Sequence, residues 1–305
     1  MINFLTNQKT DSPWVEELWC TERCMPIYNL SIVKKISKNF PYKSNLLEFG
    51  AGIGTLATLF ETNAGLKPKC LEIDTNLKRV LVDRGFECYD NIQQIDELFD
   101  GVYTSNTLEH IEDDVDALKQ IKSVMKPQSN LVVYVPAFMC LYSGWDASVG
   151  HYRRYNKKEL ISKLNDAGFE VNKIIYVDTL GFFASLAARI FGYKKSTALE
   201  GERILNFYVG GERILIFYDR FIYRISRFFD LIGFRYVFGK RTFWQWPRSC
   251  PRHRWNPYKA VRRPPALTKR TRWLNTWAQN LSLVLPQGFS FFTFLINIRV
   301  FSIKN

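Results

Sequence analysis

One long stretch of the chain has no acidic side chains, because residues 240–305 contain thirteen Lys or Arg and no Asp or Glu. The whole chain has 42 basic and 29 acidic residues, which gives a net charge of +13. Residues 1–239 are therefore balanced in charge, and the entire positive excess lies in residues 240–305, which we call the basic tail. Five of the eight tryptophans also lie in the basic tail, so the composition separates a charge-balanced region from a cationic, aromatic one.

Three interpretations of the basic tail stay open. Cations next to tryptophan suit the anionic headgroups of a membrane interface. The same residues suit contacts to phosphates and bases of nucleic acid, the interpretation we favour least. The third is a poorly structured extension, such as an altered reading frame produces. The abrupt onset near Lys240 and the missing acids favour this third interpretation.

Other absences narrow the class of protein. The apolar segment Leu281–Ile298 is interrupted by a Pro-Gln-Gly run and an Asn, so we expect no transmembrane helix. Residues 1–10 lack the apolar run of a secretory signal. The six cysteines show no zinc spacing among themselves or with His253, so we expect free thiols and no metal site. We therefore expect a cytoplasmic protein, with peripheral attachment to the inner face of the membrane left open.

The segment Asn45-Leu-Leu-Glu-Phe-Gly-Ala-Gly-Ile-Gly-Thr55 predicts a buried strand, a tight turn and a helix. Glycine reaches positive φ and lets a ligand approach bare backbone, while the helix offers unpaired N–H groups and a positive dipole end. The dinucleotide fingerprint would place its third small residue at Thr55, whereas the third glycine is Gly54. No Gly-Lys-Ser/Thr run of a phosphate-binding loop follows either.

Acidic and polar residues end the strands that follow. Glu72, at the end of the strand Cys70–Asp74, can accept both hydroxyls of an adenosine ribose, whereas Asp74 is predicted to cap the next helix. Asp90 follows a short strand at Glu87–Tyr89 and is the candidate for contact with an adenine amino group. Because ligands of parallel sheets bind at the carboxyl ends of the strands, the residues expected to converge there are Glu48, Gly50, Glu72 and Asn106.

Strands that alternate with helical segments predict an α/β fold, a Rossmann-like doubly wound αβα sandwich with a mostly parallel seven-stranded sheet. We expect a C-terminal helical or irregular basic extension beyond it. The predicted helices are Leu56–Glu61, Asn76–Arg84, Asp113–Met125 and Lys157–Ala167. Further strands are predicted at Phe99–Ser105, Leu131–Pro136 and Phe169–Val177, with Phe291–Ser302 as the closing strand and Phe234–Phe238 in reserve.

The predicted organisation has four parts. Residues 1–40 form a helical lead-in, 41–190 the cofactor-binding domain, 191–239 an amphipathic helical segment and 240–305 the basic tail. Apolar residues in 212–232 recur at helical spacing beside an Arg-rich face. Such a helix caps the sheet or lies in a membrane interface, so membrane association through residues 212–280 stays open.

Three motifs carry a resemblance to a known family. The glycine turn, the run Ser105-Asn-Thr-Leu-Glu-His-Ile-Glu-Asp-Asp114 and the segment Val135–Tyr155 together resemble class I S-adenosylmethionine (SAM) dependent methyltransferases, type 11/12-like. Within these, the chain is similar to a bacterial subgroup that accompanies polysaccharide or lipid loci. Gln128 and Ser129 stand where the subgroup usually has glycines, so the turn at Lys126–Pro127 is expected to differ.

The resemblance implies SAM as cofactor and a small-molecule, sugar-linked or lipid-linked methyl acceptor. Positioning and desolvation do most of the work, and a base matters only if the acceptor loses a proton. His151 is the first candidate for a base, since an ordinary His pKa lies near neutrality, and Asp146 is the second. His151 could equally order its loop through a backbone hydrogen bond. The expected cofactor contacts are Glu48, Gly50, Ala51, Gly52, Gly54, Glu72, Ile73, Asp90, Ser105, Asn106 and Thr107, and the expected substrate contacts are Tyr152, Arg153, Arg154 and Tyr155.

Two rival functions remain. An NAD-type Rossmann oxidoreductase would share the turn, but Thr55 argues against it. A non-catalytic SAM-binding module of a polysaccharide assembly complex would share the cofactor site and lack turnover.

Overall fold

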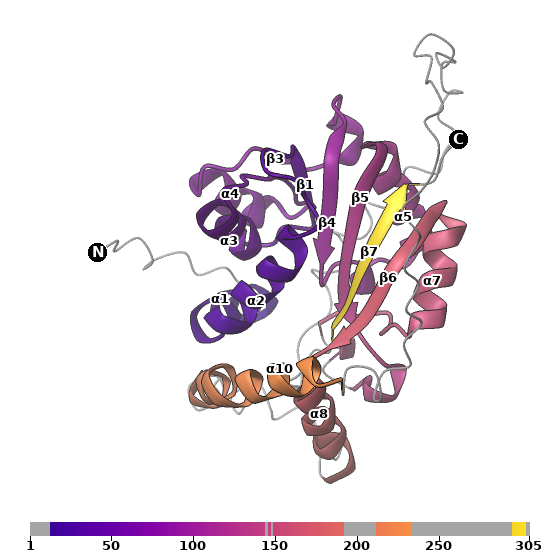
Figure 1. Ribbon diagram of the computed structural model, residues 1–305. Helices are drawn as coiled ribbons and strands as arrows, with labels where there is room; N and C mark the ends of the chain where they lie inside the picture. Colours follow the sequence, from indigo (N-terminus) through magenta and orange to yellow (C-terminus); the bar gives the residue numbers. More distant parts are fainter. Residues whose placement is uncertain (1–12, 144–145, 148, 192–211, 234–294, 303–305) are drawn as a thin grey trace.

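The computed structural model describes residues 13–143, 146–147, 149–191, 212–233 and 295–302 (Figure 1). A single sheet with strand order β3-β2-β1-β4-β5-β7-β6 forms its centre. All neighbouring strands pair in parallel except β7, which is antiparallel to both β5 and β6. The strands are β1 (Leu46–Phe49), β2 (Lys69–Leu71), β3 (Cys88–Tyr89), β4 (Phe99–Ser105), β5 (Met125–Pro136), β6 (Phe169–Val177) and β7 (Leu295–Ser302).

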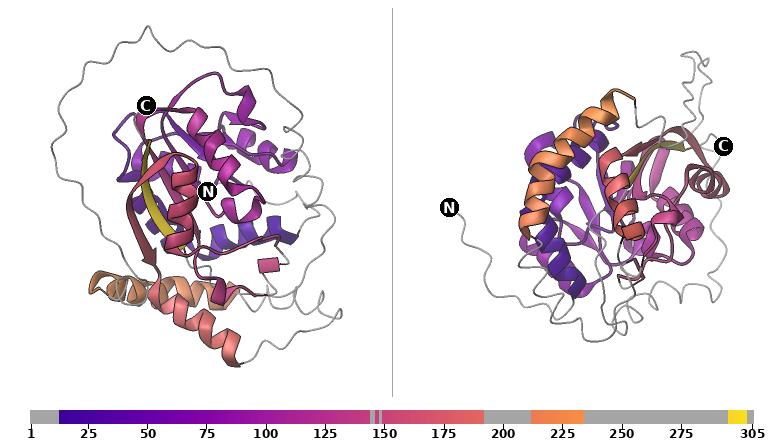
Figure 2. Two further views of the ribbon diagram at one scale, coloured as in Figure 1. Left: turned by 90° about the vertical axis from the view of Figure 1, so that its right-hand side faces the viewer. Right: turned by 90° about the horizontal axis from the view of Figure 1, so that it is seen from below.

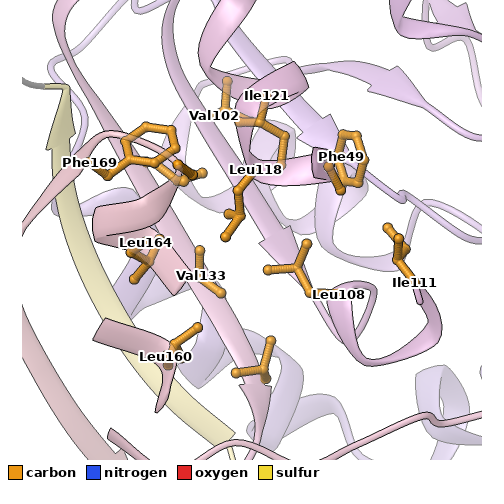
Figure 3. Packing of buried hydrophobic residues seen from close by; sticks show 14 of the residues in the cluster. Phe49, Val102, Leu108, Ile111, Leu118, Ile121, Val133, Leu160, Leu164 and Phe169 are labelled. Atoms are coloured by element: carbon orange, nitrogen blue, oxygen red, sulfur yellow. The ribbon is translucent and has the colours of Figure 1, made fainter. Parts of the chain in front are cut away.

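The sheet is covered on both faces, which explains the continuous apolar runs of its central strands. In β5, Leu131, Val133 and Val135 belong to one buried cluster, whereas Val132 and Tyr134 belong to another. This alternation follows the two-residue period of a strand. Helices α5 (Asp114–Ser123) and α7 (Lys157–Asp166) pack on the first cluster (Figure 3), and α2 (Pro26–Ser37) and α3 (Thr55–Ala64) pack on the second.

A third group of helices lies at the edge of the sheet where the parallel strands end (Figure 1). The chain leaves β6 into α8 (Thr179–Phe191), and a helical stretch from residue 212 passes through the π-helical turn η4 (Tyr218–Ile222) into α10 (Tyr223–Leu231). The views in Figure 2 show α10 lying across this end of the molecule. Two further α-helices are α1 (Pro13–Cys24) and α4 (Thr75–Asp83).

Two buried carboxylates attach α10 and η4 to the rest of the fold. Asp230 accepts hydrogen bonds from the backbone N–H groups of Asp178 (3.0 Å) and Thr179 (3.2 Å) at the start of α8. Asp219 accepts from Ile27 (2.9 Å) and Tyr28 (2.8 Å) at the start of α2. Each carboxylate thus satisfies N–H groups that the helix itself leaves unpaired.

The structure confirms the doubly wound α/β sandwich. The strands Phe99–Ser105 and Phe169–Val177 lie as predicted, and β7 falls within the predicted closing strand. The strand predicted at Cys70–Asp74 ends earlier in the structure, where β2 spans Lys69–Leu71. The reserve strand Phe234–Phe238 and most of the basic tail lie outside the described residues, although β7 itself belongs to that tail.

At Lys126–Pro127, where the sequence led us to expect an altered turn, the chain remains within β5. Residues 126–129 are an irregularity within β5, since Phe99 pairs with Met125 and Gly101 pairs next with Asn130. Gln128 has a φ of 63°, in the region that a glycine would adopt without strain. The five cysteines that the structure describes form no disulfide bond, as the sequence predicted.

We expect a chain ending at Lys240 to lose cooperative unfolding. Removing β7 leaves β5 and β6 without the strand that joins them, and exposes two rows of unpaired backbone groups. Thermal unfolding followed by circular dichroism tests this, with a chain ending at Ser302 as the control. A cooperative transition in the shorter chain would contradict the placement of β7.

Candidate functional site

The glycine turn lies at the carboxyl end of β1. Gly50, Gly52 and Gly54 have φ values of 76°, 57° and 80°. The N–H groups of Gly50 and Ala51 donate to the carbonyl oxygen of Leu71 at 2.9 and 3.2 Å, which fixes the turn against the end of β2. Gly54 is the N-cap of α3, and no described side chain caps this helix.

The three glycines are required for different reasons. A Cβ on Gly50 would lie 2.3 Å from Thr107 Cγ2, and one on Gly54 would lie 2.6 Å from Leu81 Cδ2. A Cβ on Gly52 would meet only Leu18 Cδ1, at 3.4 Å, among the described residues. Gly50 and Gly54 therefore permit close packing within the protein, whereas the side of Gly52 is open to a ligand.

Glu72 is bonded to the backbone of this glycine. Its carboxylate accepts hydrogen bonds from the N–H of Gly52 (2.8 Å) and from the N–H of Asp74 (3.0 Å). Burial raises the pKa of Glu72 to about 7, although the two hydrogen bonds favour the charged carboxylate and act to lower the pKa. A carboxylate has about four acceptor positions, and two are used here. The remaining positions suit a ligand that carries two adjacent hydroxyl groups.

The chain after β4 completes this side of the site. Thr107 is buried, and its hydroxyl lies 3.3 Å from the carbonyl oxygen of Phe49 and 3.4 Å from that of Gly50. Asn106 is exposed with a φ of 53°, and its N–H donates to Tyr134 at 2.8 Å. The structure therefore brings together the predicted cofactor residues of three strand ends: Gly50, Ala51, Gly52, Glu72, Ile73, Ser105, Asn106 and Thr107.

Two predicted cofactor residues are engaged elsewhere. The carboxyl of Glu48 accepts a hydrogen bond from the Tyr103 hydroxyl at 2.9 Å inside the protein, and burial raises its pKa to about 8. Successive strand residues face opposite sides, so Glu48 points toward the layer of α2 and α3 rather than into the turn. Asp90 is exposed and forms an ion pair with Lys78 at 2.8 Å.

Asp74 has the predicted capping role. Its carboxylate accepts hydrogen bonds from the N–H groups of Asn76 (2.8 Å) and Leu77 (3.1 Å) at the start of α4.

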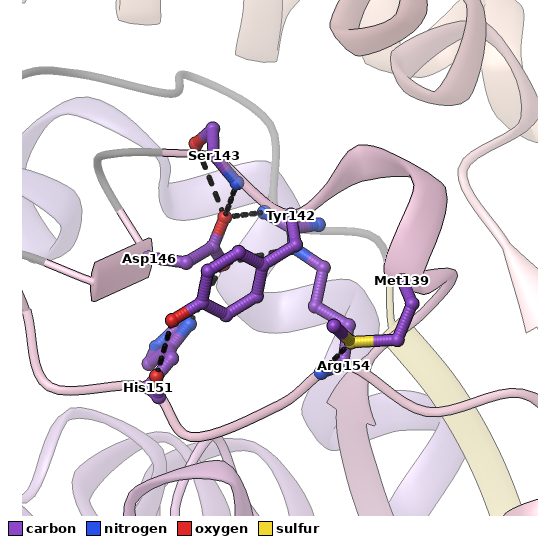
Figure 4. A network of polar contacts seen from close by, with 6 residues as sticks. All are labelled: Met139, Tyr142, Ser143, Asp146, His151 and Arg154. Carbon is purple, nitrogen blue, oxygen red and sulfur yellow. Dashed lines mark hydrogen bonds and ion pairs between the residues drawn. The ribbon is translucent and has the colours of Figure 1, made fainter.

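A buried ionic network lies beyond β5 (Figure 4). Arg154 binds Asp146 through Nε (2.8 Å) and Nη2 (3.0 Å), and His151 Nδ1 lies 2.8 Å from Asp146 Oδ1. Burial alone would raise the pKa of Asp146, but the bonds from His151 and Arg154 outweigh it and lower that pKa. Burial lowers the pKa of His151, although Asp146 opposes the shift. At neutral pH the network therefore contains an ionised Asp146 and a neutral His151.

Glu109 and His110 lie against this network. The rings of His110 and His151 pack edge to face with centroids 4.6 Å apart, and the N–H of Tyr152 donates to the Glu109 carbonyl at 2.8 Å. Glu109 is fully buried, and neither carboxyl oxygen has a hydrogen-bond partner among the described residues. Burial raises the pKa of Glu109 to about 8, while burial and then His151 lower the pKa of His110 to about 3. Sequence reasoning overlooked Glu109, because in this mostly polar stretch nothing sets it apart from the acidic residues Glu112, Asp113 and Asp114.

The four predicted substrate residues divide into two pairs. Tyr152 is exposed, and Arg153 is partly exposed and bound to Asp114 at 2.8 Å. Arg154 and Tyr155 are fully buried, the first on Asp146 and the second through its hydroxyl on Asp114 at 2.8 Å. The interpretation of Arg154 and Tyr155 as substrate contacts is therefore corrected, because both are enclosed by the protein and bonded to its carboxylates.

The fold and the strand-end site together define the class of protein. Residues 22–174 match the family model described as a methyltransferase domain, which is half of the chain. The chain belongs to this family and is a SAM-dependent methyltransferase, with SAM as its cofactor. Comparison with curated proteins finds no match.

Solved structures with a similar fold include further methyltransferases. A SAM-dependent methyltransferase of Thermotoga maritima is 21% identical, with 54% of this chain and 83% of that chain covered at a TM-score of 0.46. One of Archaeoglobus fulgidus is 18% identical, with 61% and 85% covered at a TM-score of 0.43. A glycopeptide N-methyltransferase complexed with SAM is 15% identical, with 49% and 86% covered at a TM-score of 0.42. These likenesses are too distant to add to the family match.

We expect Asp146→Asn to lower the free energy of unfolding by about 3–5 kcal/mol, because it leaves Arg154 as an uncompensated buried charge. Since the pKa of Asp146 is held below its ordinary value, this loss is full at neutral pH and shrinks only below about pH 4. Urea denaturation measures the effect.

Asp90→Asn is the matched control, since the Asp90–Lys78 pair is exposed and is expected to contribute less than about 1 kcal/mol. Adding Arg154→Met to Asp146→Asn should recover part of the lost stability. Equal effects of the two Asp variants would contradict the assignment of a buried charge pair.

Proposed function

We propose that the chain transfers a methyl group from SAM to a small-molecule, sugar-linked or lipid-linked acceptor, with the glycine turn holding the cofactor. The observation that carries this proposal is the open side of Gly52 together with the buried carboxylate of Glu72 that binds the Gly52 N–H. SAM supplies a sulfonium-bound methyl group that reacts without further activation.

The proposed cofactor contacts follow from these positions. Glu72 would accept the two ribose hydroxyls, and the added donors would compensate the carboxylate for its burial. The backbone of Gly50, Ala51 and Gly52 would line the cofactor site, and Thr107 would pack against Gly50 on the other side of the turn. Glu48 supports the turn from behind and Asp90 stays with Lys78, so we do not include either as a direct contact.

The acceptor would react at the side of Glu109, His110 and His151, because Glu109 and His110 follow Thr107 directly after β4 and the ring of His151 packs against that of His110. His151, backed by Asp146, is the candidate for accepting a proton from the acceptor. Tyr152 and Arg153 are the proposed acceptor contacts, since they reach the surface next to it.

We expect Gly52→Ala to weaken SAM binding at least about tenfold, because the new methyl group occupies the open side of the turn. Gly65→Ala is the matched control. Gly65 has a φ of 64°, and its Cβ would meet Tyr42 at 3.6 Å, so both variants cost about 1–2 kcal/mol of stability. Isothermal titration calorimetry measures the affinities, and equal binding by both variants would contradict the proposed cradle.

Calorimetry with the unaltered chain separates the rival functions. Binding of SAM and S-adenosylhomocysteine is expected, and binding of NAD in their place would favour the oxidoreductase. SAM binding without turnover on glycolipid or polysaccharide-precursor extracts would favour the non-catalytic module. A folded chain that binds neither sulfur nucleoside would contradict the proposal.

A second proposal concerns where the acceptor is met. Exposed apolar side chains follow one another at helical spacing through η4 and α10, and exposed arginines run beside them. Such a face suits the interface of an anionic membrane, with peripheral rather than spanning attachment. Among the described residues, no helix combines the length and apolar character that crossing a membrane requires. The apolar residues are Ile214, Phe217, Phe221, Ile225, Phe228, Leu231 and Ile232, and the arginines are Arg213, Arg220, Arg224 and Arg227.

We expect Phe221→Ser combined with Phe228→Ser to weaken binding to vesicles of anionic phospholipid at least about tenfold, since two half-exposed aromatic side chains no longer enter the interface. Vesicle co-sedimentation measures the binding. Tyr42→Ser is the control, because Tyr42 is an exposed aromatic residue outside this face. Absence of vesicle binding by the unaltered chain would contradict membrane attachment.

A further inference from the structure

Three potential metal ligands meet beside the proposed acceptor position. Glu109, His110 and His151 each offer one ligand atom, and these atoms all lie within 4.8 Å of one another. Glu109 and His110 come from the short helix η2 (Leu108–His110) after β4, whereas His151 comes from the loop after β5. Two segments far apart in the sequence thus bring together two imidazoles and a carboxylate.

Glu109 gives an independent sign of a missing partner. Its side chain is fully buried, yet neither carboxyl oxygen has a hydrogen-bond partner among the described residues. Buried carboxyl groups are normally hydrogen-bonded, paired with a charge or bound to a metal. A protonated Glu109 would still leave an O–H donor unused, so neutralisation alone does not satisfy this group. A cation bound between Glu109 and the two rings would satisfy it.

The histidines also have the supports that metal ligands require. His151 Nδ1 bonds to Asp146, whose other carboxylate oxygen accepts from the N–H of Ser143 at 2.8 Å. The backbone of Val149 and Gly150 acts on the His110 ring and opposes the lowering of its pKa. Metal-binding histidines almost always donate their second N–H to a carboxylate or a backbone carbonyl, which fixes the ring orientation.

We propose that Glu109, His110 and His151 bind a divalent transition-metal ion that in turn holds an oxygen of the methyl acceptor. Two imidazoles with one carboxylate suit Zn²⁺, Fe²⁺, Mn²⁺ or Co²⁺ better than Mg²⁺ or Ca²⁺, which prefer oxygen ligands alone. Three protein ligands leave positions open for a substrate. The three ligand atoms lie within 4.8 Å of one another, and bonds of ordinary length to one ion place such atoms about 3.3 Å apart, so the three side chains would draw together when the ion binds.

A metal at this position would select acceptors by their oxygen atoms. This role of the metal rests on the proposed function, because it requires that the chain methylates an acceptor here. A hydroxyl next to a divalent ion loses its proton more readily, so acceptors with paired or chelating oxygens are favoured. The bond that forms joins this oxygen to the methyl carbon, and the bond that breaks joins that carbon to the sulfonium sulfur. The released proton passes to solvent. His151 would then be a metal ligand rather than the base itself.

The test is metal binding by the full chain after treatment with a chelator. Calorimetry with Mn²⁺ and absorption spectroscopy with Co²⁺ measure affinity and ligand type, and S-adenosylhomocysteine binding is measured on the same samples. These ions are chosen because Cys20, Cys24 and Glu212 form a second candidate cluster that would attract Zn²⁺. We expect one equivalent of Mn²⁺, and a Co²⁺ spectrum of nitrogen and oxygen ligation.

Glu109→Gln and His151→Gln are expected to weaken Mn²⁺ binding at least about 100-fold, beyond the 10- to 100-fold typical of losing an outer partner. Glu112→Gln and His253→Gln are matched controls that should bind as the unaltered chain does, since Glu112 is an exposed neighbour and His253 is the third histidine. Glu109→Gln should unfold at the same temperature as the unaltered chain, or higher, without metal, and should lose the rise that metal produces.

Absence of Mn²⁺ and Co²⁺ binding by the unaltered chain would overturn the proposal, as would a thiolate Co²⁺ spectrum or binding that survives in both variants. The spectrum decides even if a variant fails to fold. If S-adenosylhomocysteine binds while the metals do not, only the metal site is rejected. If the nucleoside does not bind, the proposed function fails instead.

Discussion

The hydrogen bond from the Gly52 N–H to the Glu72 carboxylate is the contact on which the site depends. It joins the turn after β1 to the residue that follows β2, and the bonds from Gly50 and Ala51 to Leu71 hold the same two segments together. This arrangement requires positive φ at three alternating positions, and a Cβ at the first would collide with Thr107. The end of β4 therefore approaches the turn only because the turn is made of glycine.

The buried carboxylates of the site differ in how many of their oxygen atoms are hydrogen-bonded within the protein. The charge of Asp146 is matched by Arg154, and its remaining acceptors bind Ser143 and His151, so the carboxylate of Asp146 is fully bonded, although Arg154 Nη1 has no partner among the described residues. Glu72 and Glu109 have fewer partners than their oxygens allow, and burial raises the pKa of both. Glu72 and Glu109 therefore keep acceptor positions for ligands, while the network around Asp146 orients His151 beside Glu109.

Much of the fold follows from sequence patterns, because apolar runs and glycine spacing report local structure. The strands Phe99–Ser105 and Phe169–Val177 and the cap at Asp74 were predictable from neighbours along the chain. The contact between Glu109 and His151 was not, since it depends on how the loop after β5 folds back over η2. Glu48 was predicted to contact the cofactor because it lies close to the glycines in the sequence. The two-residue period of a strand instead turns its side chain to the other face of the sheet, where it binds Tyr103.

The position of β7 has a consequence for biosynthesis. Residues 295–302 lie between β5 and β6, although more than a hundred residues of chain separate β6 from β7. During translation, β5 and β6 emerge from the ribosome long before the strand that joins them is synthesised. The nascent chain therefore presents two open sheet edges for that interval, which is the condition under which chaperones bind and aggregation begins.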